Sequence, residues 1–381
     1  MKKRKILNLI TISILTLTLI ITLTSCRRGF DPSQWRGVWV TNVDSKVLDS
    51  RESIEEAMAF LADKGFNVVM PVVWNDAWTL YPSKLMTAMF DREISPRFAG
   101  RDPLKELIDA AHANGLLVVA WFEYGFAASY KKNGGALLEK KPEWAAKDAE
   151  GNLLTKNGFE WMNGYMPEVQ DFIISLVLEV VENYDVDGVQ GDDRLPAQPI
   201  HGGYSDFTVD LYKSEHDGAL PPGDHRDKEW QKWRGDKLNA FAKRLYDDVK
   251  AADPGVLVTW APSVYPWCYD EYLQDWPAWI EGGYADAVIP QVYRYNREAY
   301  ENTLTALDRI KKELKAYDTP ILPGVLLNVG SYVMDNEFLD ATIRMNREHG
   351  YDGEVFFFYE GLRKEGNRTA NSIAPFYKDN K

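Results

Sequence analysis

The sequence predicts a (β/α)8 barrel, and three observations indicate this α/β fold class. Apolar strand-like runs alternate along the chain with amphipathic helical runs, and eight strands can be recognised. The strand runs are almost continuously apolar, which is typical of parallel strands that are buried on both faces. Two predicted helices end at a Gly that leads directly into the next strand, in "ADKGFN" and "AHANGL". We therefore expect a TIM barrel that forms a single domain.

The predicted elements follow one another along the chain without a low-complexity linker or an internal repeat. In order, the strands are "RGVWVTN" from Arg36, "NVVMPVVW" ending at Trp74, "LLVVAWFEYGF" from Leu116, "VDGVQGDD" ending at Asp193, "VLVTWAPS" from Val256, "DAVIPQVYR" from Asp286, "ILPGVLLN" from Ile321 and "GEVFFFYEGL" from Gly353. Helices are expected near residues 53–64, 103–114, 168–183, 227–252, 298–316 and 337–349. A doubly wound sheet is the alternative, but no Gly-rich phosphate fingerprint follows the first strand.

Two connections between these elements are unusually long. Residues 127–167 follow the third strand, and residues 195–228 follow the fourth. Both leave the carboxyl ends of strands, where barrel enzymes carry their active sites. Long loops in compact domains are usually functional, so we expect these two to form the walls of a groove.

The amino terminus has the pattern of an export signal. Basic residues at positions 2–5 precede an apolar run from Ile6 to Leu23, and "LTSC" ends at Cys26. A Cys directly after Leu-Thr-Ser resembles a bacterial lipobox, in which the Cys becomes the lipid-bearing first residue. We expect a lipoprotein signal peptide over 1–26, a tether over 27–34 and the barrel over 35–381, exported and lipid-anchored to the bacterial cell envelope. The alternative is an uncleaved anchor helix, because about 18–20 apolar residues can span a bilayer.

The charge and the cysteine count exclude some classes of partner and bond. The net charge of the chain is −13, and loss of the four basic residues of the signal would make it more negative. Nucleic acid and anionic lipid headgroups should repel so acidic a protein. Only Cys268 would remain after cleavage, so no internal disulfide is expected.

Acids, amides and large aromatic residues end the predicted strands, and the carboxyl ends of parallel strands meet at one face of a barrel. The candidate substrate-binding residues at this face are Trp39, Asn42, Trp74, Asn75, Trp121, Arg194, Trp260, Gln291, Tyr293 and Asn328. Aromatic rings can stack on the C–H faces of sugars, and amides can hydrogen-bond sugar hydroxyls. We expect at least one of Trp74, Trp121 and Trp260 to stack on a sugar; the alternative is that all three are core residues.

Two adjacent acids at the end of the fourth strand, Asp192 and Asp193, are the first candidate catalytic residues. Hydrolysis of a glycosidic bond needs two carboxyls, one as the acid and one as the nucleophile or base. Asp192 is expected to be the ionised nucleophile or base, held by Arg194 or by an amide. Asp193 is expected to bind hydroxyls or to orient its neighbour. The alternative for this pair is a helix cap or a solvated turn.

Glu123 and Glu360 are the other candidate catalytic carboxyls. Glu123 lies between Phe122 and Tyr124, where desolvation would raise its pKa as a proton donor requires. The alternative for Glu123 is a salt bridge to a loop Lys or Arg. Glu360 follows the eighth strand and is the weaker candidate.

Metal sites and nucleophilic triads are not indicated. The chain has five His, and those at positions 201, 216 and 225 share one loop without an HxH or HExxH spacing. Ser263 has no nucleophile-elbow context and no evident His partner. We expect no cofactor and no catalytic metal, and a surface calcium held by loop Asp residues is left open.

An ordered set of motifs resembles the bacterial glycosyl-hydrolase-like family 10 proteins, which are distinct from the family 10 xylanases. The motifs are "RGVWVTN", "NVVMPVVWNDAWTLYPS", "DPLKELIDAAHANGLLVVAWFEYGF", "WMNGYMPEVQDFI", "VDGVQGDDR" and "PQVYR". The resemblance covers the chain from about Trp35 to the eighth strand. It implies a TIM barrel, an exported or lipid-anchored protein and a glycan substrate. One lipoprotein of this family is known as a hydrolase of peptidoglycan strands stripped of their peptides.

The fourth strand also resembles the α-amylase signature, which here runs from Asp187 to the nucleophile position Asp192. Two departures limit this similarity. Gln190 stands where amylases have Arg, and "TWAPSV" lacks the acid that amylases carry on the fifth strand. The proton donor should therefore come from another strand, and Glu123 is the candidate.

These observations together predict an exported, lipid-anchored glycoside hydrolase that acts on a bacterial cell-wall or related β-linked glycan. The alternative is a glycan-binding lipoprotein that has the same aromatic groove and does not turn over its ligand.

Overall fold

The computed structural model describes residues 31–378. The chain divides into two units, Met1–Asp31 and Pro32–Lys381, and every strand and helix of the described residues lies in the second unit. The predicted signal peptide and Cys26 lie outside the described residues. Within the described range, no helix is both long enough and apolar enough to cross a membrane.

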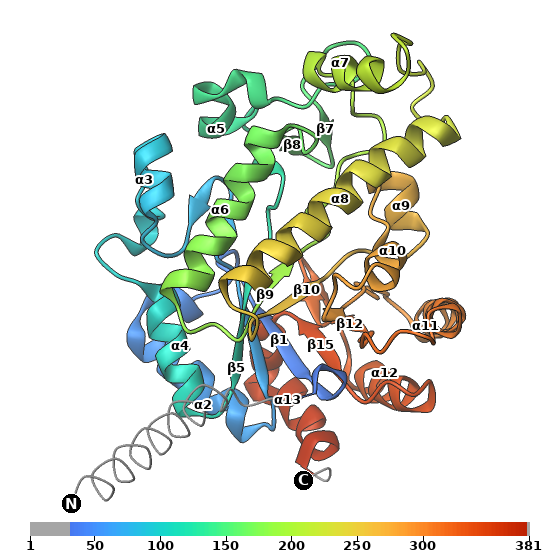
Figure 1. The fold of residues 1–381 in the computed structure, drawn as a ribbon. Coiled ribbons are helices and arrows are strands. Elements are labelled where there is room, and N and C mark those ends of the chain that lie inside the picture. The colour runs from blue at the N-terminus through green and yellow to red at the C-terminus, as the bar shows by residue number, and fades with distance from the viewer. Residues whose placement is uncertain (1–30, 379–381) are drawn as a thin grey trace, which may run out of the picture. The chain divides into compact units, whose positions relative to one another are not determined.

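Eight parallel strands form the predicted barrel (Figure 1). They are β1 (Arg36–Val40), β2 (Val68–Pro71), β5 (Leu117–Phe122), β9 (Gly188–Gly191), β10 (Leu257–Trp260), β11 (Ala287–Val288), β12 (Gly324–Leu326) and β15 (Glu354–Phe357). The sheet order is β11-β10-β9-β5-β2-β1-β15-β12. Parallel bridges from Val288 to Ile321 and from Gln291 to Gly324 join the two end strands and close the barrel. Closure protects the edges of the sheet, and the predicted fold class is confirmed.

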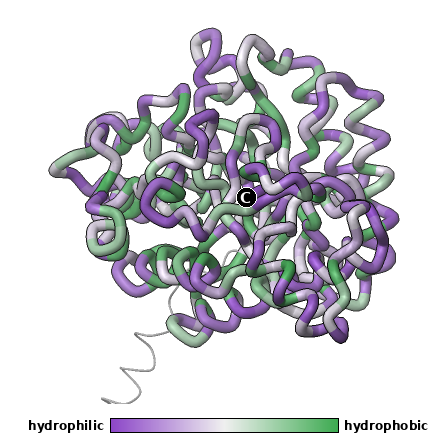
Figure 2. The backbone as a smooth tube through the Cα atoms, turned by 90° about the horizontal axis from the view of Figure 1, so that it is seen from above, coloured by the Kyte–Doolittle hydropathy of each residue, from purple (hydrophilic) through white to green (hydrophobic). Residues whose placement is uncertain are grey.

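Helices between the strands cover the outside of the barrel (Figure 1). They are α2 (Arg51–Asp63), α4 (Pro103–Ala113), α6 (Pro167–Asn183), α8 (Lys228–Ala252), α11 (Arg297–Glu313), α12 (Asn336–Glu348) and α13 (Tyr359–Lys378). Ser50, Asp102 and Asp227 each cap a helix by accepting the backbone N–H three residues later. Hydrophobic and hydrophilic positions alternate along these outer coils of the chain, as Figure 2 shows, because only one stripe of each helix meets the sheet.

Both long connections carry structure of their own. The first contains helix α5 (Gly135–Lys140) and an antiparallel sheet of β6 (Ala127–Tyr130), β8 (Phe159–Trp161) and β7 (Thr155–Lys156). The second contains α7 (Asp206–Glu215), and Figure 1 shows α5, α7 and this sheet beyond the carboxyl ends of the barrel strands. Lys156 of the first connection and Arg226 of the second bind the two carboxylate oxygens of Glu271 at 2.6 and 2.7 Å. The two connections are therefore linked at the face where the site was expected.

Shorter elements complete the loops at this face. They are the hairpin of β3 (Trp74–Asn75) and β4 (Trp78–Thr79), helix α3 (Lys84–Phe90), helices α9 (Trp267–Tyr272) and α10 (Trp276–Glu281) between β10 and β11, and the hairpin of β13 (Asn328–Val329) and β14 (Tyr332–Val333).

The eighth strand is shorter than the sequence predicts. It ends at Phe357, and α13 begins at Tyr359, so Glu360 lies in the first turn of a helix and not at a strand end. The apolar run hides this boundary because Phe358 and Tyr359 are buried, like most of the strand residues before them.

Candidate active site

The register of the strands defines which side chains point into the barrel. Gln190 of β9 is paired with Trp121 of β5 and with Thr259 of β10, and paired residues of parallel strands point to the same face. The Gln190 side chain donates to Thr259 Oγ1 at 3.2 Å and accepts from Trp39 of β1, a strand that is not its neighbour in the sheet, so this face is the interior. Asp192 and Glu123 each follow two residues after an interior position. The alternation of side chains therefore brings both carboxyls to the mouth of the barrel.

Arg194 contacts all three carboxyls of the cluster. Its Nη2 lies 3.0 Å from Asp192 Oδ2 and 3.4 Å from Glu123 Oε1, and its Nη1 lies 2.9 Å from Asp193 Oδ1. The side chains of Arg194 and Asp192 are 12% and 3% exposed, so these contacts form largely away from water. The site therefore holds three acids and one base, which fits a cluster that retains at least one proton.

Aromatic rings and a backbone carbonyl fix the position of the Arg194 guanidinium. It lies 4.6 Å from the ring centre of Phe159 and 5.7 Å from that of Tyr124, and its Nε donates to the Glu123 carbonyl oxygen at 3.0 Å. Burial opposes the charge of Arg194, but the neighbouring carboxyls outweigh it and raise the pKa further above its usual value. Because Phe159 belongs to β8, the first long connection supports the site directly.

Two side-chain amides complete the contacts of the Asp192 and Glu123 carboxyls, and a third holds the backbone of Asp192. Gln291 Nε2 donates to Asp192 Oδ1 at 2.8 Å, and Asn75 Nδ2 donates to Glu123 Oε2 at 2.5 Å. Gln274 Nε2 donates to the carbonyl oxygen of Asp192 at 3.0 Å. Both oxygens of Asp192 therefore face groups that can only donate, which favours the carboxylate form.

The surroundings raise the pKa of both Asp192 and Glu123. Burial is the main cause in each case, and the neighbouring Asp193 adds to it, while Arg194 acts in the opposite direction. The pKa of Asp192 lies well above its usual range, and that of Glu123 is also raised. An ionised Asp192 beside a protonated Glu123 would require the two pKa values to move apart. In the structure both rise, because both groups share one buried, acidic environment.

Aromatic side chains form the floor beneath the carboxyls. The rings of Trp39, Trp121 and Phe357 lie 6.2–6.3 Å from one another, and Tyr293 stacks on Phe357 at 5.4 Å. Trp39 Nε1 donates to Gln190 Oε1 at 2.7 Å. The indole N–H of Trp121 is buried and has no hydrogen-bond partner among the described residues. The floor thus contains one buried donor without a partner within residues 31–378.

Two tryptophans that were expected at the site do not face it. Trp260 is adjacent to the interior residue Thr259 and so points outward, where its ring packs on Trp279 of α10 at 5.1 Å. Trp74 packs on Phe172 of α6 at 5.8 Å, and both indoles are fully buried. In the structure Trp74 and Trp260 therefore occupy core positions, and Trp121 is the one of the three expected tryptophans that faces the interior of the barrel.

Three further candidates lie apart from the contacts of the carboxyl cluster. Glu360 accepts a hydrogen bond from Ser45 at 2.9 Å, and the Asn42 carbonyl oxygen accepts one from Arg97 at 2.5 Å. Asn328 belongs to the β13–β14 hairpin and is buried beside Gly361. Glu360 is the clearest correction, because its helix directs it to the loop after β1.

Sequence reasoning missed Gln274 and Phe159. Gln274 follows α9, and Phe159 lies within the first long connection, so neither is at a strand end. The length of that connection was the only signal that pointed to Phe159. Within residues 31–378 the structure brings together no set of three His, Cys, Asp or Glu side chains suited to a metal ion.

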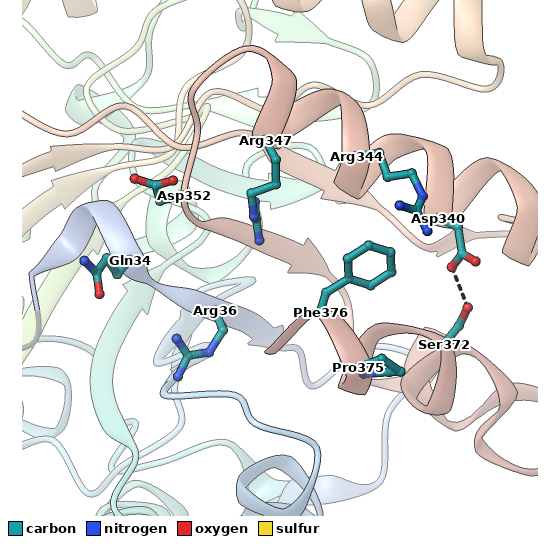
Figure 3. A pocket seen from close by; sticks show the side chains of 9 residues that line it. All are labelled: Gln34, Arg36, Asp340, Arg344, Arg347, Asp352, Ser372, Pro375 and Phe376. Carbon is teal, nitrogen blue, oxygen red and sulfur yellow. Dashed lines mark hydrogen bonds between the residues drawn. The ribbon is translucent and has the colours of Figure 1, made fainter. Parts of the chain in front are cut away.

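A cavity of about 970 Å³ lies at the opposite end of the barrel, near the start of β1 (Figure 3). Arg36, Arg344 and Arg347 line it together with Phe376 of α13. Arg347 Nη1 forms an ion pair with Glu354 Oε2 at 2.7 Å, and Arg36 Nε donates to the Gly65 carbonyl oxygen. Arg36 and Arg347 serve the packing of this end of the barrel, so the carboxyl cluster remains the candidate active site despite the size of this cavity.

Residues 34–340 match the family described as glycosyl hydrolase-like 10. Glycosyl hydrolase YngK of Bacillus subtilis is 25% identical over 76% of this chain. Glycosyl hydrolase DigH of Escherichia coli K12 is 26% identical over 67% of this chain. The matches span 60% of the length of each relative.

Solved structures share the fold at lower sequence identity. The glycoside hydrolase domain of PgaB (BpsB) from Bordetella bronchiseptica superposes with a TM-score of 0.67 and 14% identity, covering 89% of this chain and 98% of that domain. The catalytic domain of β-amylase from Paenibacillus polymyxa has a TM-score of 0.64 and 10% identity, covering 92% and 99%. The family match extends over more than half of the chain, and the neighbours are barrels of glycoside hydrolases. The chain belongs to the glycosyl hydrolase-like 10 family.

Proposed function

We propose that the protein is a glycosidase in which Asp192 and Glu123 form the catalytic carboxyl pair and Arg194 positions them. The observation that carries this proposal is the contact of one buried guanidinium with three carboxyls at the mouth of the barrel. A structural ion pair would need one acid for this base. The additional buried acids destabilise the folded protein, and such destabilising clusters are typical of catalytic sites.

The separation of the two carboxyls favours a retaining mechanism. Arg194 Nη2 contacts one oxygen of each, at 3.0 and 3.4 Å, so these oxygens can be no further apart than the sum of the two distances. That sum is below the roughly 6.5 Å at which the range for inverting enzymes begins. This bound applies to one oxygen of each carboxyl, and it supports retention over inversion for the pair.

The proposed reaction has two steps. The Asp192 carboxylate attacks the anomeric carbon, the bond to the leaving sugar breaks, and Glu123 gives its proton to the leaving oxygen. Glu123, now ionised, takes a proton from a water that attacks the same carbon, which releases Asp192 and a sugar of unchanged configuration. A proton on Glu123 removes one of the charges that oppose the ionisation of Asp192. Gln291 and Arg194 then stabilise the Asp192 carboxylate by hydrogen bonds.

The proposed substrate is a β-linked glycan of the bacterial cell wall. The resemblance to a family with a member that cleaves peptide-free peptidoglycan strands supports this choice, and the relatives in two bacteria are both called glycosyl hydrolases. Phe357 and Tyr293 of the floor are partly exposed and stack at 5.4 Å, so they offer an apolar surface to a sugar, whereas Trp39 and Trp121 beside them are buried.

Purified protein and peptide-free peptidoglycan strands provide the test. We expect the wild type to release reducing ends and the Asp192→Asn variant to bind the strands without cleaving them. NMR of the first product should show retained configuration, and first appearance of the opposite anomer would contradict the two-step reaction. A wild type that binds strands and releases no reducing ends would identify a glycan-binding protein instead.

The role of Glu123 has its own test. The Glu123→Gln variant should cleave substrates with poor leaving groups far more slowly than substrates with activated leaving groups, which need little protonation. Equal slowing of both substrate classes would assign the proton to another group, and Asp193 is then the remaining acid of the cluster.

We also propose that Cys26 carries a lipid and tethers the protein to the cell envelope. The "LTSC" sequence after a basic and apolar segment motivates this proposal. The Cys26→Ser variant should leave the membrane fraction or keep its signal peptide. Normal fractionation with normal acyl labelling of the variant would contradict the proposal.

A further inference from the structure

The exposed large apolar side chains of the described residues are concentrated at one end of the barrel. Seven of the eight lie on segments that leave the carboxyl ends of strands, and the eighth, Tyr317, lies at the other end between α11 and β12. The seven are Val43, Tyr130, Leu220, Trp267, Tyr295, Val329 and Val333. Exposed apolar groups that gather around a site indicate a binding surface.

Trp267 of α9 forms the first aromatic patch. It is 48% exposed, and its ring lies 5.6 Å from that of Tyr272, which in turn lies 6.0 Å from Trp161 of β8. The Tyr272 hydroxyl accepts a hydrogen bond from Asn157 at 2.9 Å. Burial and the charge of Asp193 raise the pKa of Tyr272 to about 12, in keeping with its position beside the carboxyl cluster.

Tyr295 forms the second patch, on the segment that follows β11. It is 61% exposed and meets Tyr332 of β14 edge to face at 4.8 Å. Val329 and Val333 of the same hairpin are also exposed. Tyr295 lies two residues after Tyr293, which stacks on Phe357 in the floor of the site. The second patch therefore continues the aromatic floor outward along another strand.

We propose that the Trp267 patch and the Tyr295 patch bind sugars of a single glycan chain that crosses the carboxyl cluster. The substrate would then be an extended polymer gripped on both sides of the bond that reacts, and not a short terminal fragment. This inference rests on the proposed function and adds the length of the substrate to it.

The form of the patches suits sugar rings. Trp267 and Tyr295 are each held by one aromatic neighbour at an angle, 53° for Trp267 and 89° for Tyr295, so a flat face is left uncovered by that neighbour. Polar groups stand close to the first patch, where Asn157 binds the Tyr272 hydroxyl and Lys156 lies over the Tyr272 ring at 4.3 Å. Flat apolar faces beside hydrogen-bonding groups match the alternating C–H and hydroxyl surface of a pyranose.

The test measures binding in the Asp192→Asn background, where the strands stay intact. Trp267→Ala and Tyr295→Ala are compared with Tyr317→Ala, a matched control in which an exposed aromatic side chain is removed at the far end of the barrel. The probes are long peptide-free peptidoglycan strands and a disaccharide from the same polymer. Each site variant should bind the long strands about tenfold more weakly than the control and should lose part of the preference for long strands over the disaccharide.

The outcomes separate this inference from the proposed function. If the site variants bind long strands as tightly as the Tyr317→Ala control, the inference is wrong even when the wild type hydrolyses the strands. If the variants lose affinity and the wild type hydrolyses nothing, the binding surface stands and the hydrolase assignment fails. If no strand binds to any variant, the proposed binding surface and the hydrolase assignment are both wrong for this polymer. A protein ligand of this face would then be tested next.

Discussion

The two ends of the barrel each contain a buried carboxylate network, and the networks differ in how completely their charges are paired. At the amino-terminal end Glu354 is fully buried and accepts four hydrogen bonds, from Asn346 at 3.0 Å, from two nitrogens of Arg347 at 2.7 and 3.0 Å and from the Tyr377 hydroxyl at 2.6 Å. One acid meets one base, and both carboxylate oxygens are satisfied.

The network at the carboxyl-terminal end is unbalanced. Asp192, Asp193 and Glu123 share the single base Arg194, and burial raises the pKa of two of them. Balanced ion pairs with complete hydrogen bonding are compatible with a stable core, whereas unpaired buried charge is destabilising. The difference indicates that one end of the barrel is built for stability and the other for chemistry, as the barrel architecture leads one to expect.

Changing one carboxyl to an amide at each end of the barrel tests this difference directly. The largest expected effect is the loss of activity in Asp192→Asn. Asp192→Asn removes the proposed nucleophile, so hydrolysis of peptide-free strands should fall by about 10³-fold or more. The free energy of unfolding should stay the same or increase, because a buried like charge is lost. Reducing-end assays and urea unfolding measure the two quantities. A strongly destabilised variant would show that the cluster is structural and not catalytic.

Glu354→Gln should have the opposite profile. It leaves the charge of Arg347 without its partner in a site that is mostly buried, so the free energy of unfolding should fall by about 3 kcal/mol. Strand hydrolysis by the folded protein should be unchanged at low temperature. The double variant with Arg347→Met should recover part of the lost stability, since both charges are then absent. If Glu354→Gln lost activity but kept its free energy of unfolding, the proposed difference between the two ends of the barrel would be wrong.

Arg194→Lys tests whether the shape of the base matters as well as its charge. A lysine keeps one positive charge but cannot contact three carboxyls at once through a planar fork. We expect activity to fall by about 10–100-fold and the acidic limb of the pH–rate profile to shift to higher pH, because the Asp192 carboxylate is less well stabilised. An unchanged pH–rate profile of the Arg194→Lys variant would show that Arg194 contributes to packing and does not stabilise the Asp192 carboxylate.

The smallest expected effect is on the pH dependence of stability. Burial holds the pKa of Asp192 in the folded protein above its usual 3.8. The folded protein therefore binds more protons than the unfolded chain above about pH 4, and the free energy of unfolding should decrease as pH rises through that window. Urea unfolding from pH 4 to neutrality should show a smaller decrease for Asp192→Asn. Asp210→Asn, which changes an exposed carboxyl of α7, is the control and should follow the wild type.

The expectation that the carboxyl ends of the strands meet at one face identified the residues of the candidate site but not their arrangement. Asp192, Asp193, Arg194, Glu123, Asn75 and Gln291 were expected at one face, and the structure joins them by direct contacts. Glu123 and Arg194 are 71 positions apart, and the pairing of β5 with β9 brings them together. Phe159 and Gln274 could not be found in this way, because each lies on a loop or after a short helix.

The number of barrel strands, the barrel and the acids at the strand ends can be predicted from the amino-acid sequence, because long apolar runs separated by amphipathic helices permit few other folds. Which tryptophans face the site depends on how the strands pair. Trp121 points into the barrel, while Trp260 points outward to Trp279. A strand that is buried on both faces shows no alternation of polar and apolar residues, so inward and outward positions carry the same residue types. The inward and outward positions are distinguished only by the register of neighbouring strands, which is set when the strands pair.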